Sequence, residues 1–416
     1  MESISSKELP VVTLKPKGQD RLRSGHLWVF RNEVEKPPAS LEPGDLVSVQ
    51  GRSGRRLGIG YANPSSTIFV RFLINAVFER NRKVLGLYDN EIPDLSSLFR
   101  IRLEDALSMR ERRLPDQDAL RLVYGESDFL PGLIVDRYNG IVVVQIGAMG
   151  MERRRALLMD LLKDMLKPEA LLERSETASR IREGLEKRTE WIVPPPPGLS
   201  DGKVWIVENG GRFLVDTLTG QKTGYYLDQR DNRRAVQSFA RERRVLDCFC
   251  STGAFSVQCA LGGAAEVLGV DSSRTSVDIA RINAEKNSVS DRCRFETADC
   301  ISFLRSAAEK GGFYDLVILD PPSFARKRSA AQDASRGYRE INLRAIKALP
   351  RYGLLATSSC SQIIERDRFL SIMYAAAKDA RRLLRPLYEG CQPPDHPILL
   401  SMPETRYLKF FIFEVL

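Results

Sequence analysis

Cys360 stands at the tip of a predicted strand, in the stretch "LLATSSCSQIIERD" from Leu354 to Asp367. An apolar run leads into Thr357, two serines, Cys360 and a third serine, which is typical of a buried strand that ends in a polar turn. A core thiol more often lies inside the apolar run. A thiolate at a strand end is a candidate nucleophile. A buried, inert thiol is the interpretation kept for the other six cysteines.

Four aspartates lie at the carboxyl ends of other predicted strands. They occur in "DCFCSTGAF", "VDSS", "ADC" and "LDPPSF", and are Asp247, Asp271, Asp299 and Asp320. Ligands of open α/β sheets bind beyond these strand ends. Four carboxylates gathered there repel one another unless they have partners or a ligand rich in donors, such as a nucleoside. For each aspartate alone, a helix N-cap or a loop carboxylate is the alternative.

The elements that position these residues form an alternating pattern from Val245 onward. The predicted strands are "VLDCF", "EVLGVD", "CRFETA", "DLVILD" and "GLLATS", and amphipathic helices such as "SSVDIARINAEKN" lie between them. Such alternation predicts a parallel, doubly wound sheet, here a Rossmann-like α/β domain. The last segments, "RLLRPLYEG" and "RYLKFFIFEVL", are expected to add an antiparallel edge.

Two more domains are predicted before this one, so the fold class is multidomain α/β. Residues 1–76 contain short β-rich pieces between Gly, Pro and Ser turns, which favour a small β-barrel. Residues 77–197 are predicted to form a connector with one charged helix, "LEDALSMRERRL", and a middle α+β domain with a hairpin at Asn139-Gly140. "IVPPPPGLSDG" is the best linker candidate before the third domain, residues 198–416.

The composition excludes several classes of protein. The 416 residues include no apolar run long enough for a membrane span and no secretory h-region at the N-terminus. Seven cysteines without CxxC spacing and two histidines indicate neither a zinc site nor a disulfide framework. We therefore expect a cytoplasmic protein without a metal.

The net charge of +9 fits either a solvated basic surface or a nucleic-acid partner. Two basic segments are candidates for RNA phosphates. The first, "LKPKGQDRLRSGHLWVFR", interleaves basic and aromatic residues, and the second, "ARKRSAAQDASRGYR", follows the Asp-Pro-Pro turn. A solvated charge is the alternative for each side chain. The candidate RNA-binding residues are Lys17, Arg23, Arg326, Lys327 and Arg328.

The motifs together resemble a known family. "DCFCSTGAFSV", "VDSS", "ADC" and "ILDPPSF" look like class I S-adenosylmethionine-dependent methyltransferases. "GQKTGYYLDQRDNR", "VYGESDFLPGLIVDRY" and the late "SSCS" resemble, more narrowly, RNA methyltransferases with a PUA domain, a middle α+β domain and a methyltransferase domain in that order. The best-known members of that family make 5-methylcytosine in 23S ribosomal RNA.

The resemblance implies a role for each motif residue. Asp271 would hold the ribose hydroxyls and Asp299 would face the adenine amine. Asp320, with the rigid Pro321-Pro322 turn, would shape the floor where base and methyl group meet. The residues implied to bind S-adenosylmethionine are Lys222, Thr223, Gly224, Tyr226, Asp247, Gly253, Asp271, Asp299 and Asp320.

The expected reaction is methyl transfer from S-adenosylmethionine, leaving S-adenosylhomocysteine, to carbon 5 of a ribosomal RNA cytosine. Cys360 would attack carbon 6, and Asp320 would recognise the cytosine amine or ring nitrogen. Asp320 or a water would remove the carbon 5 proton. Three alternatives remain open: methylation of uracil at carbon 5, methylation of a guanine nitrogen, and a non-catalytic RNA-binding ribosome-assembly factor. The oligomeric state is also open, with a homodimer as one alternative.

Overall fold

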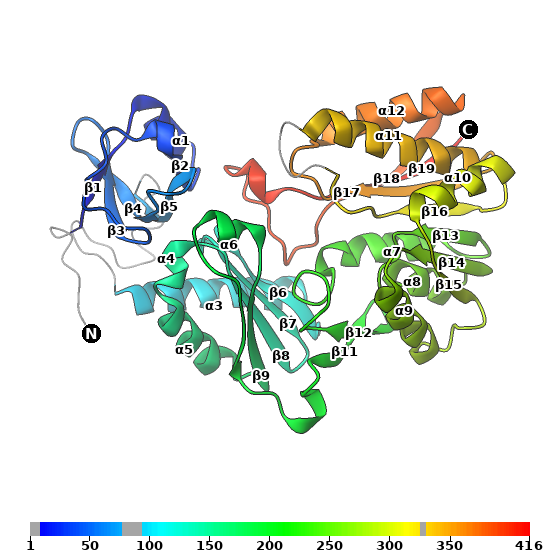
Figure 1. Ribbon diagram of the computed structural model, residues 1–416, viewed down its shortest axis with the longest axis horizontal. Helices are drawn as coiled ribbons and strands as arrows, with labels where there is room; N and C mark the ends of the chain where they lie inside the picture. Colours follow the sequence, from blue (N-terminus) through cyan, green and yellow to red (C-terminus); the bar gives the residue numbers. More distant parts are fainter. Residues whose placement is uncertain (1–8, 77–93, 325–329) are drawn as a thin grey trace. The chain divides into compact units, whose positions relative to one another are not determined.

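The computed structural model describes residues 9–76, 94–324 and 330–416 (Figure 1). The chain divides into two compact units. The first consists of Met1–Val204, Val215–Tyr225 and Pro394–Thr405, and the second of Trp205–Leu214, Tyr226–Pro393 and Arg406–Leu416. Both units therefore contain discontinuous segments, and the three domain ranges expected from the sequence stay a prediction. No helix within the described ranges is long and apolar enough to cross a membrane.

The first unit begins with a five-stranded sheet in the order β1-β3-β4-β5-β2. Glycine lets two neighbouring strands approach closely here, since a Cβ on Gly58 of β4 would lie 2.1 Å from the carbonyl oxygen of Ile74 of β5. This small β-domain confirms the expected N-terminal fold. Its elements are β1 (Val11–Thr13), α1 (Pro16–Arg23), β2 (Trp28–Phe30), β3 (Leu46–Gln50), β4 (Arg56–Ala62) and β5 (Ile68–Asn75).

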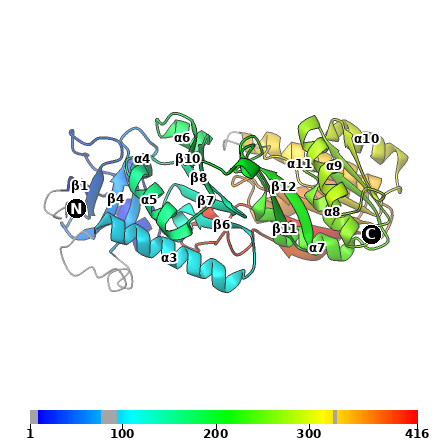
Figure 2. The same ribbon diagram turned by 90° about the horizontal axis from the view of Figure 1, so that it is seen from below.

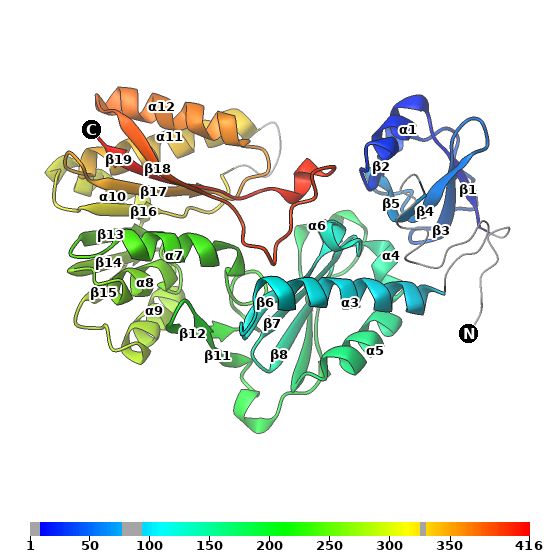
Figure 3. The ribbon, with the colours of Figure 1, turned by 180° about the vertical axis from the view of Figure 1, so that it is seen from behind.

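A second five-stranded sheet of the first unit has the order β10-β9-β8-β7-β6. Asn139 adopts φ 51° in the turn that joins β7 to β8, as the Asn-Gly signal predicts. Two helices, α3 and α5, cover one face of the sheet (Figure 3), and α3 is longer than the sequence pattern indicated. The elements are α3 (Leu95–Arg113), β6 (Ala119–Tyr124), β7 (Leu133–Tyr138), β8 (Ile141–Ile146), α4 (Met149–Glu152), α5 (Arg155–Leu166), β9 (Ala170–Ser175), α6 (Ala178–Arg182) and β10 (Arg188–Val193).

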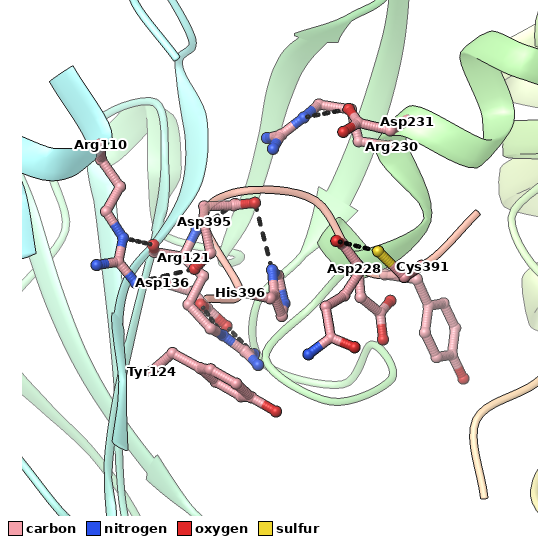
Figure 4. A network of polar contacts seen from close by, with 12 residues as sticks. Arg110, Arg121, Tyr124, Asp136, Asp228, Arg230, Asp231, Cys391, Asp395 and His396 are labelled. Atoms are coloured by element: carbon pink, nitrogen blue, oxygen red, sulfur yellow. Dashed lines mark hydrogen bonds and ion pairs between the residues drawn. The ribbon is translucent and has the colours of Figure 1, made fainter. Parts of the chain in front are cut away.

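Two largely buried arginines of the first unit each pair with a carboxylate, and Figure 4 labels one of these pairs, Arg121 and Asp136. Arg110, which is 1% exposed, donates two hydrogen bonds of 2.6 and 2.8 Å to the carboxylate of Asp128. Arg121 donates two bonds of 2.7 and 2.8 Å to Asp136. The segment Pro394–Thr405 joins this network, because the backbone N–H of Arg121 donates to Asp395 at 3.0 Å. These bidentate pairs compensate the cost of burying each charge.

The second unit contains a seven-stranded sheet in the order β15-β14-β13-β16-β17-β19-β18. The first five strands are parallel, whereas β19 runs antiparallel to both β17 and β18, which confirms the expected antiparallel edge. The strands are β13 (Arg244–Cys248), β14 (Glu266–Asp271), β15 (Cys293–Thr297), β16 (Leu316–Leu319), β17 (Leu354–Ser359), β18 (Leu384–Gly390) and β19 (Lys409–Val415).

Three helices cover each face of this sheet (Figures 1 and 2), as the alternating pattern predicts. The strand order reverses direction between β13 and β16, and ligands of open α/β sheets bind at such a point. One face carries α7 (Arg230–Phe239), α8 (Ala254–Leu261) and α9 (Arg274–Lys286); the other carries α10 (Cys300–Lys310), α11 (Ala331–Ala348) and α12 (Arg366–Ala380). A glycine hairpin, β11 (Lys203–Glu208) and β12 (Gly211–Asp216), forms a separate two-stranded sheet.

Candidate active site of the C-terminal sheet

The parallel register brings three polar strand ends to one level of the sheet. Cys248 of β13 pairs with both Val270 of β14 and Leu319 of β16, so Asp271 and Asp320 each lie one residue beyond that level. The pairing of β16 with β17 continues this arrangement to Ser358, two residues before Cys360. Residues predicted from separate motifs therefore meet at the carboxyl edge because parallel strands share it.

Asp247 lies deeper in the sheet than the other aspartates and is fully buried. Its Oδ2 accepts a 2.6 Å hydrogen bond from Ser256 Oγ. Its Oδ1 has no hydrogen-bond partner among the residues that the structure describes. Burial raises the pKa of Asp247 to about 7, and the charges of Asp320 and Asp271 act in the same direction. A buried acceptor without a donor is suited to a cationic or N–H group of a ligand.

The loop after β13 repeatedly adopts the left-handed conformation. Phe249, Ser251 and Gly253 have φ of 65°, 49° and 76°. At Gly253 a side chain is excluded, since a Cβ would lie 2.8 Å from the Cβ of Ala280. Strained backbone of this kind is often found at binding sites, where a loop must pass close to a ligand.

Asp271 anchors that loop. One oxygen accepts a hydrogen bond of 2.9 Å from the N–H of Ser251, and the other accepts one of 2.8 Å from Ser273. Each carboxylate oxygen has a second lone pair, so both retain acceptor capacity. Asp271 can therefore hold the loop and accept ligand hydroxyls together.

Asp299 has a clear structural role. It is the N-cap of α10, and its Oδ1 accepts a 2.8 Å hydrogen bond from the N–H of Ser302. The hydrogen bonds from Ser302 lower the pKa of Asp299. The side chain is exposed at the end of the edge strand β15. The helix-cap alternative is thus correct for this residue, and its predicted contact with adenine stays a prediction.

Asp320 is held by donors from two other elements. Its Oδ1 accepts hydrogen bonds from the hydroxyl of Ser358 and, at 2.9 Å, from Nε2 of Gln229. Gln229 is in turn held by Asn232, whose Nδ2 donates to Oε1 of Gln229 at 2.6 Å. Because Gln229 and Asn232 are almost completely buried, this chain of amides fixes the orientation of the carboxylate.

Cys360 differs from the buried cysteines by its exposure. It is partly exposed, and its charge helps to raise the pKa values of Tyr226 and Tyr338, although burial is the larger cause for both. Asp320 acts on the same two tyrosines, so these four side chains lie within electrostatic reach of one another. The five buried thiols, whose pKa values are raised by burial, are Cys248, Cys250, Cys259, Cys293 and Cys300.

Other predicted site residues lie elsewhere or are not described. Lys222, Thr223 and Gly224 belong to the first compact unit, where the hydroxyl of Thr223 donates to Asp136 at 2.6 Å. Lys17 and Arg23 are exposed on α1, as RNA contacts require. Their contact with cofactor or RNA stays a prediction. Arg326, Lys327 and Arg328 lie outside the described residues.

Sequence reasoning missed three residues around the thiol. Gln229 stood in the quoted motif "GYYLDQR" but received no role, and Tyr338 stood in the basic segment "ARKRSAAQDASRGYR" and received none either. Lys409 had a clearer signal, because it is a charged residue directly before the apolar run "FFIF". A lysine at a buried strand position is rare enough to ask for a partner.

Comparison with known proteins defines the class first. A model for S-adenosylmethionine-dependent methyltransferases matches residues 181–397, more than half of the chain, and a model for PUA-like domains matches residues 12–75. Solved structures with the same fold include a Streptococcus mutans protein described as an S-adenosylmethionine-dependent methyltransferase. Its TM-score is 0.80 at 19% sequence identity, and the match covers 97% of this chain and 100% of that one. The chain is an S-adenosylmethionine-dependent methyltransferase with a PUA-like domain.

Two curated relatives then define the family. Ribosomal RNA large subunit methyltransferase I of Erwinia tasmaniensis is 37% identical over 407 residues, which cover 96% of this chain and 98% of the relative. The protein of the same name from Tolumonas auensis is 38% identical over 405 residues, with 96% and 97% coverage. The chain belongs to the family of ribosomal RNA large subunit methyltransferases I, which confirms the resemblance stated from its motifs.

Proposed function

We propose that this protein forms 5-methylcytosine in large-subunit ribosomal RNA, with Cys360 as the nucleophile. The observation that carries the proposal is the position of Cys360: a partly exposed thiol, two residues beyond the serine that donates to Asp320. The relatives named for large-subunit ribosomal RNA support the class of substrate. Since ribosomal RNA is the proposed substrate, we expect the protein to work in the cytoplasm.

The thiol is needed because carbon 5 of a cytosine is a weak nucleophile. The thiolate of Cys360 forms a bond to carbon 6, and the displaced electron pair makes carbon 5 nucleophilic. When bound, S-adenosylmethionine supplies the electrophilic methyl group that carbon 5 accepts. A base in the site then takes the carbon 5 proton, and the electrons of that bond expel the thiolate from carbon 6. Cys360 is thereby restored for another cycle.

Asp320 is suited to recognition of cytosine. Its oxygens only accept hydrogen bonds when the group is ionised, and Gln229 and Ser358 fix one of them. An acceptor placed in this way favours the exocyclic amine of cytosine over the carbonyl of uracil. The orientation is fixed before the base arrives, so little reorganisation is needed.

S-adenosylmethionine fits the acidic edge described above. The unpaired Oδ1 of Asp247 is suited to the cationic amino-acid end, and Gly253 provides room for close approach. Asp271 retains acceptor capacity for the ribose hydroxyls. Asp299 at the adenine, and Tyr226 and the Lys222–Gly224 segment against the cofactor, are further parts of this proposal.

The first experiment compares the native protein with Cys360→Ala, Cys360→Ser and the control Cys391→Ser. Cys391 is the matched control because it is the other partly exposed cysteine. Each protein is incubated with labelled S-adenosylmethionine and unmodified ribosomal RNA, and the methylated nucleoside is identified by mass spectrometry. We expect 5-methylcytosine from the native protein and the control, and none from either Cys360 variant, although both still bind the cofactor.

Other results would select the alternatives. Full methylation by the Cys360 variants would make the thiol structural and favour transfer to a guanine nitrogen. Cofactor binding by the native protein without transfer to any RNA would favour an assembly factor. Formation of 5-methyluracil would keep the mechanism and overturn the proposed base.

A further inference from the structure

A buried lysine lies beside the turn that carries Cys360. Lys409 is the first residue of β19 and pairs with Ser359, the last residue of β17. Its side chain is only 5% exposed. Lysine is almost never buried without a compensating group, so the position of this ammonium group requires an explanation.

The ammonium group of Lys409 is held by neutral acceptors. It donates one hydrogen bond to the carbonyl oxygen of Ser361 and another, of 2.6 Å, to that of Tyr407. In the part of the chain that the structure describes, no carboxylate lies within ion-pair distance of its Nζ. The carbonyl groups satisfy two N–H donors but leave the positive charge without an opposite charge.

Electrostatic effects connect this charge to Cys360. Burial lowers the pKa of Lys409 to about 8, and the charge of Cys360 opposes this shift more strongly than any other group. Lys409 is therefore still largely protonated at pH 7. Since the interaction between two charges is reciprocal, a group that stabilises the ammonium is stabilised by it.

We propose that Lys409 is a positioning residue for the nucleophile: its buried ammonium group stabilises the thiolate form of Cys360 across the β17–β19 pair. The inference rests on the proposed function only in so far as that function makes Cys360 the nucleophile. A thiolate attacks, and a thiol does not, so the lysine increases the reactive fraction without touching the substrate.

The other charged and titratable groups around Cys360 and Lys409 do not supply a buried positive charge that could stabilise the thiolate. After the larger effect of burial, the charges of Asp320 and Cys360 both raise the pKa values of Tyr226 and Tyr338, and negative charge on any of these groups disfavours a thiolate nearby. Glu365 and Arg406 act on Lys409, but both are exposed and screened by solvent. Lys409 is thus the buried cation of this group.

The test measures the reactivity of the thiol as a function of pH. In a Cys391→Ser background, the remaining cysteines besides Cys360 are buried, so iodoacetamide reports on Cys360. The variants are Lys409→Met, which removes the charge, Lys409→Gln, which keeps N–H donors for the two carbonyls, and Lys409→Arg, which keeps the charge. Arg406→Met is the matched control, since it removes an exposed cation three residues away.

We expect the midpoint of the alkylation profile to rise by about one pH unit in Lys409→Met and Lys409→Gln. It should stay near the parent value in Lys409→Arg and Arg406→Met. Methylation at pH 7 should fall about tenfold in the two neutral variants, recover at pH 9, and show an unchanged KM for RNA. Circular dichroism shows whether each variant folds. If Lys409→Met does not fold, the measurement is made on Lys409→Gln, which also lacks the charge.

An unchanged midpoint in folded Lys409→Gln would overturn the inference and leave Lys409 as a structural tie between two loops. Absence of 5-methylcytosine from the native protein would instead refute the proposed function. The alkylation midpoint would still decide the role of Lys409, because it requires neither RNA nor cofactor.

Discussion

The buried Arg110–Asp128 and Arg121–Asp136 pairs of the first unit contrast with the buried charges at the carboxyl edge of the C-terminal sheet. In the first unit, Arg110 meets Asp128 and Arg121 meets Asp136, each through two hydrogen bonds. At the carboxyl edge of the C-terminal sheet, and among the residues that the structure describes, Asp247 has an oxygen without a partner and Lys409 has only neutral acceptors. Two opposite charges that are bonded to each other compensate the loss of hydration on burial, whereas a buried charge without such a partner needs a ligand or an ionisable neighbour. Pairing thus distinguishes these two arginine–aspartate pairs from the charges of the candidate site, whereas membership of a unit does not, since Arg233 and Glu208 of the second unit also form a buried pair.

Breaking a pair in the first unit should have the largest effect. Arg110→Met leaves the carboxylate of Asp128 buried without its partner, so we expect a loss of about 3–5 kcal/mol in the free energy of unfolding. Chemical denaturation followed by circular dichroism measures this loss. Alkylation of Cys360 in the folded protein should be unchanged, since the thiol belongs to the other unit.

The control for that prediction is Arg100→Met. Arg100 pairs with Asp164 on the surface, where both side chains are largely exposed, and should contribute less than about 1 kcal/mol. If Arg110→Met and Arg100→Met lowered the free energy of unfolding equally, burial of the Arg110–Asp128 pair would not explain its contribution to stability.

Asp320→Asn should have the opposite profile, with a large effect on activity and little on stability. The substitution replaces one acceptor oxygen by an N–H₂ group, which repels the amine of cytosine. We expect single-turnover methylation to fall about 100-fold, with cofactor binding reduced far less. Ser358→Ala, which leaves the carboxylate in place, should reduce the rate less than about tenfold. A native rate in Asp320→Asn would exclude the proposed recognition.

Asp247→Asn should stabilise the cofactor-free protein. The folded-state pKa of about 7 lies above the ordinary value of 3.8. The buried carboxyl group therefore destabilises the folded protein least below about pH 4, where it is protonated. As pH rises to about 7, the folded protein loses stability relative to the unfolded chain. Removing the ionisable group should therefore raise the free energy of unfolding by roughly 2–4 kcal/mol at pH 8 and much less at pH 4. Cofactor binding should be weakened.

Asp315→Asn is a control for which we expect the opposite change in stability. Burial raises the pKa of its carboxyl group, but the hydrogen bonds from Arg244 outweigh this effect, so the pKa is lowered overall. Its contribution is present at neutral pH and is lost as pH falls. Asp315→Asn should thus destabilise the protein at pH 8. If Asp247→Asn and Asp315→Asn both stabilised the protein, the presence of a hydrogen-bonding partner would not determine whether removing a carboxylate raises or lowers the free energy of unfolding.

Asp299 should show the smallest effect, because it is exposed and caps a helix. Asparagine is an equally good N-cap, so Asp299→Asn should leave the melting temperature unchanged and raise the KM for S-adenosylmethionine by a few-fold. Asp299→Ala should also lower the melting temperature slightly. An unchanged KM in both variants would assign Asp299 to capping alone.

Local patterns predicted the elements and the strand-end residues of the site. The alternation after Val245, the Asn139-Gly140 turn and the apolar last segment are each patterns of residue types that neighbouring positions reveal. Cys360 and Asp320 were identifiable for the same reason, since each directly follows an apolar strand and parallel strands share an edge. The length of α3 was underestimated because Arg102 and Arg110 occupy buried positions of the helix and weaken its apolar periodicity.

Long-range packing decided which of these residues have partners. Lys409 reaches the turn of Cys360 because β19 inserts antiparallel between β17 and β18, an arrangement that depends on the whole sheet. Thr223 bonds to Asp136 within the first unit although its motif neighbour Tyr226 belongs to the second. Residue types and spacing thus define which groups can react, whereas burial and pairing, which set their charge states, arise only when distant segments pack together.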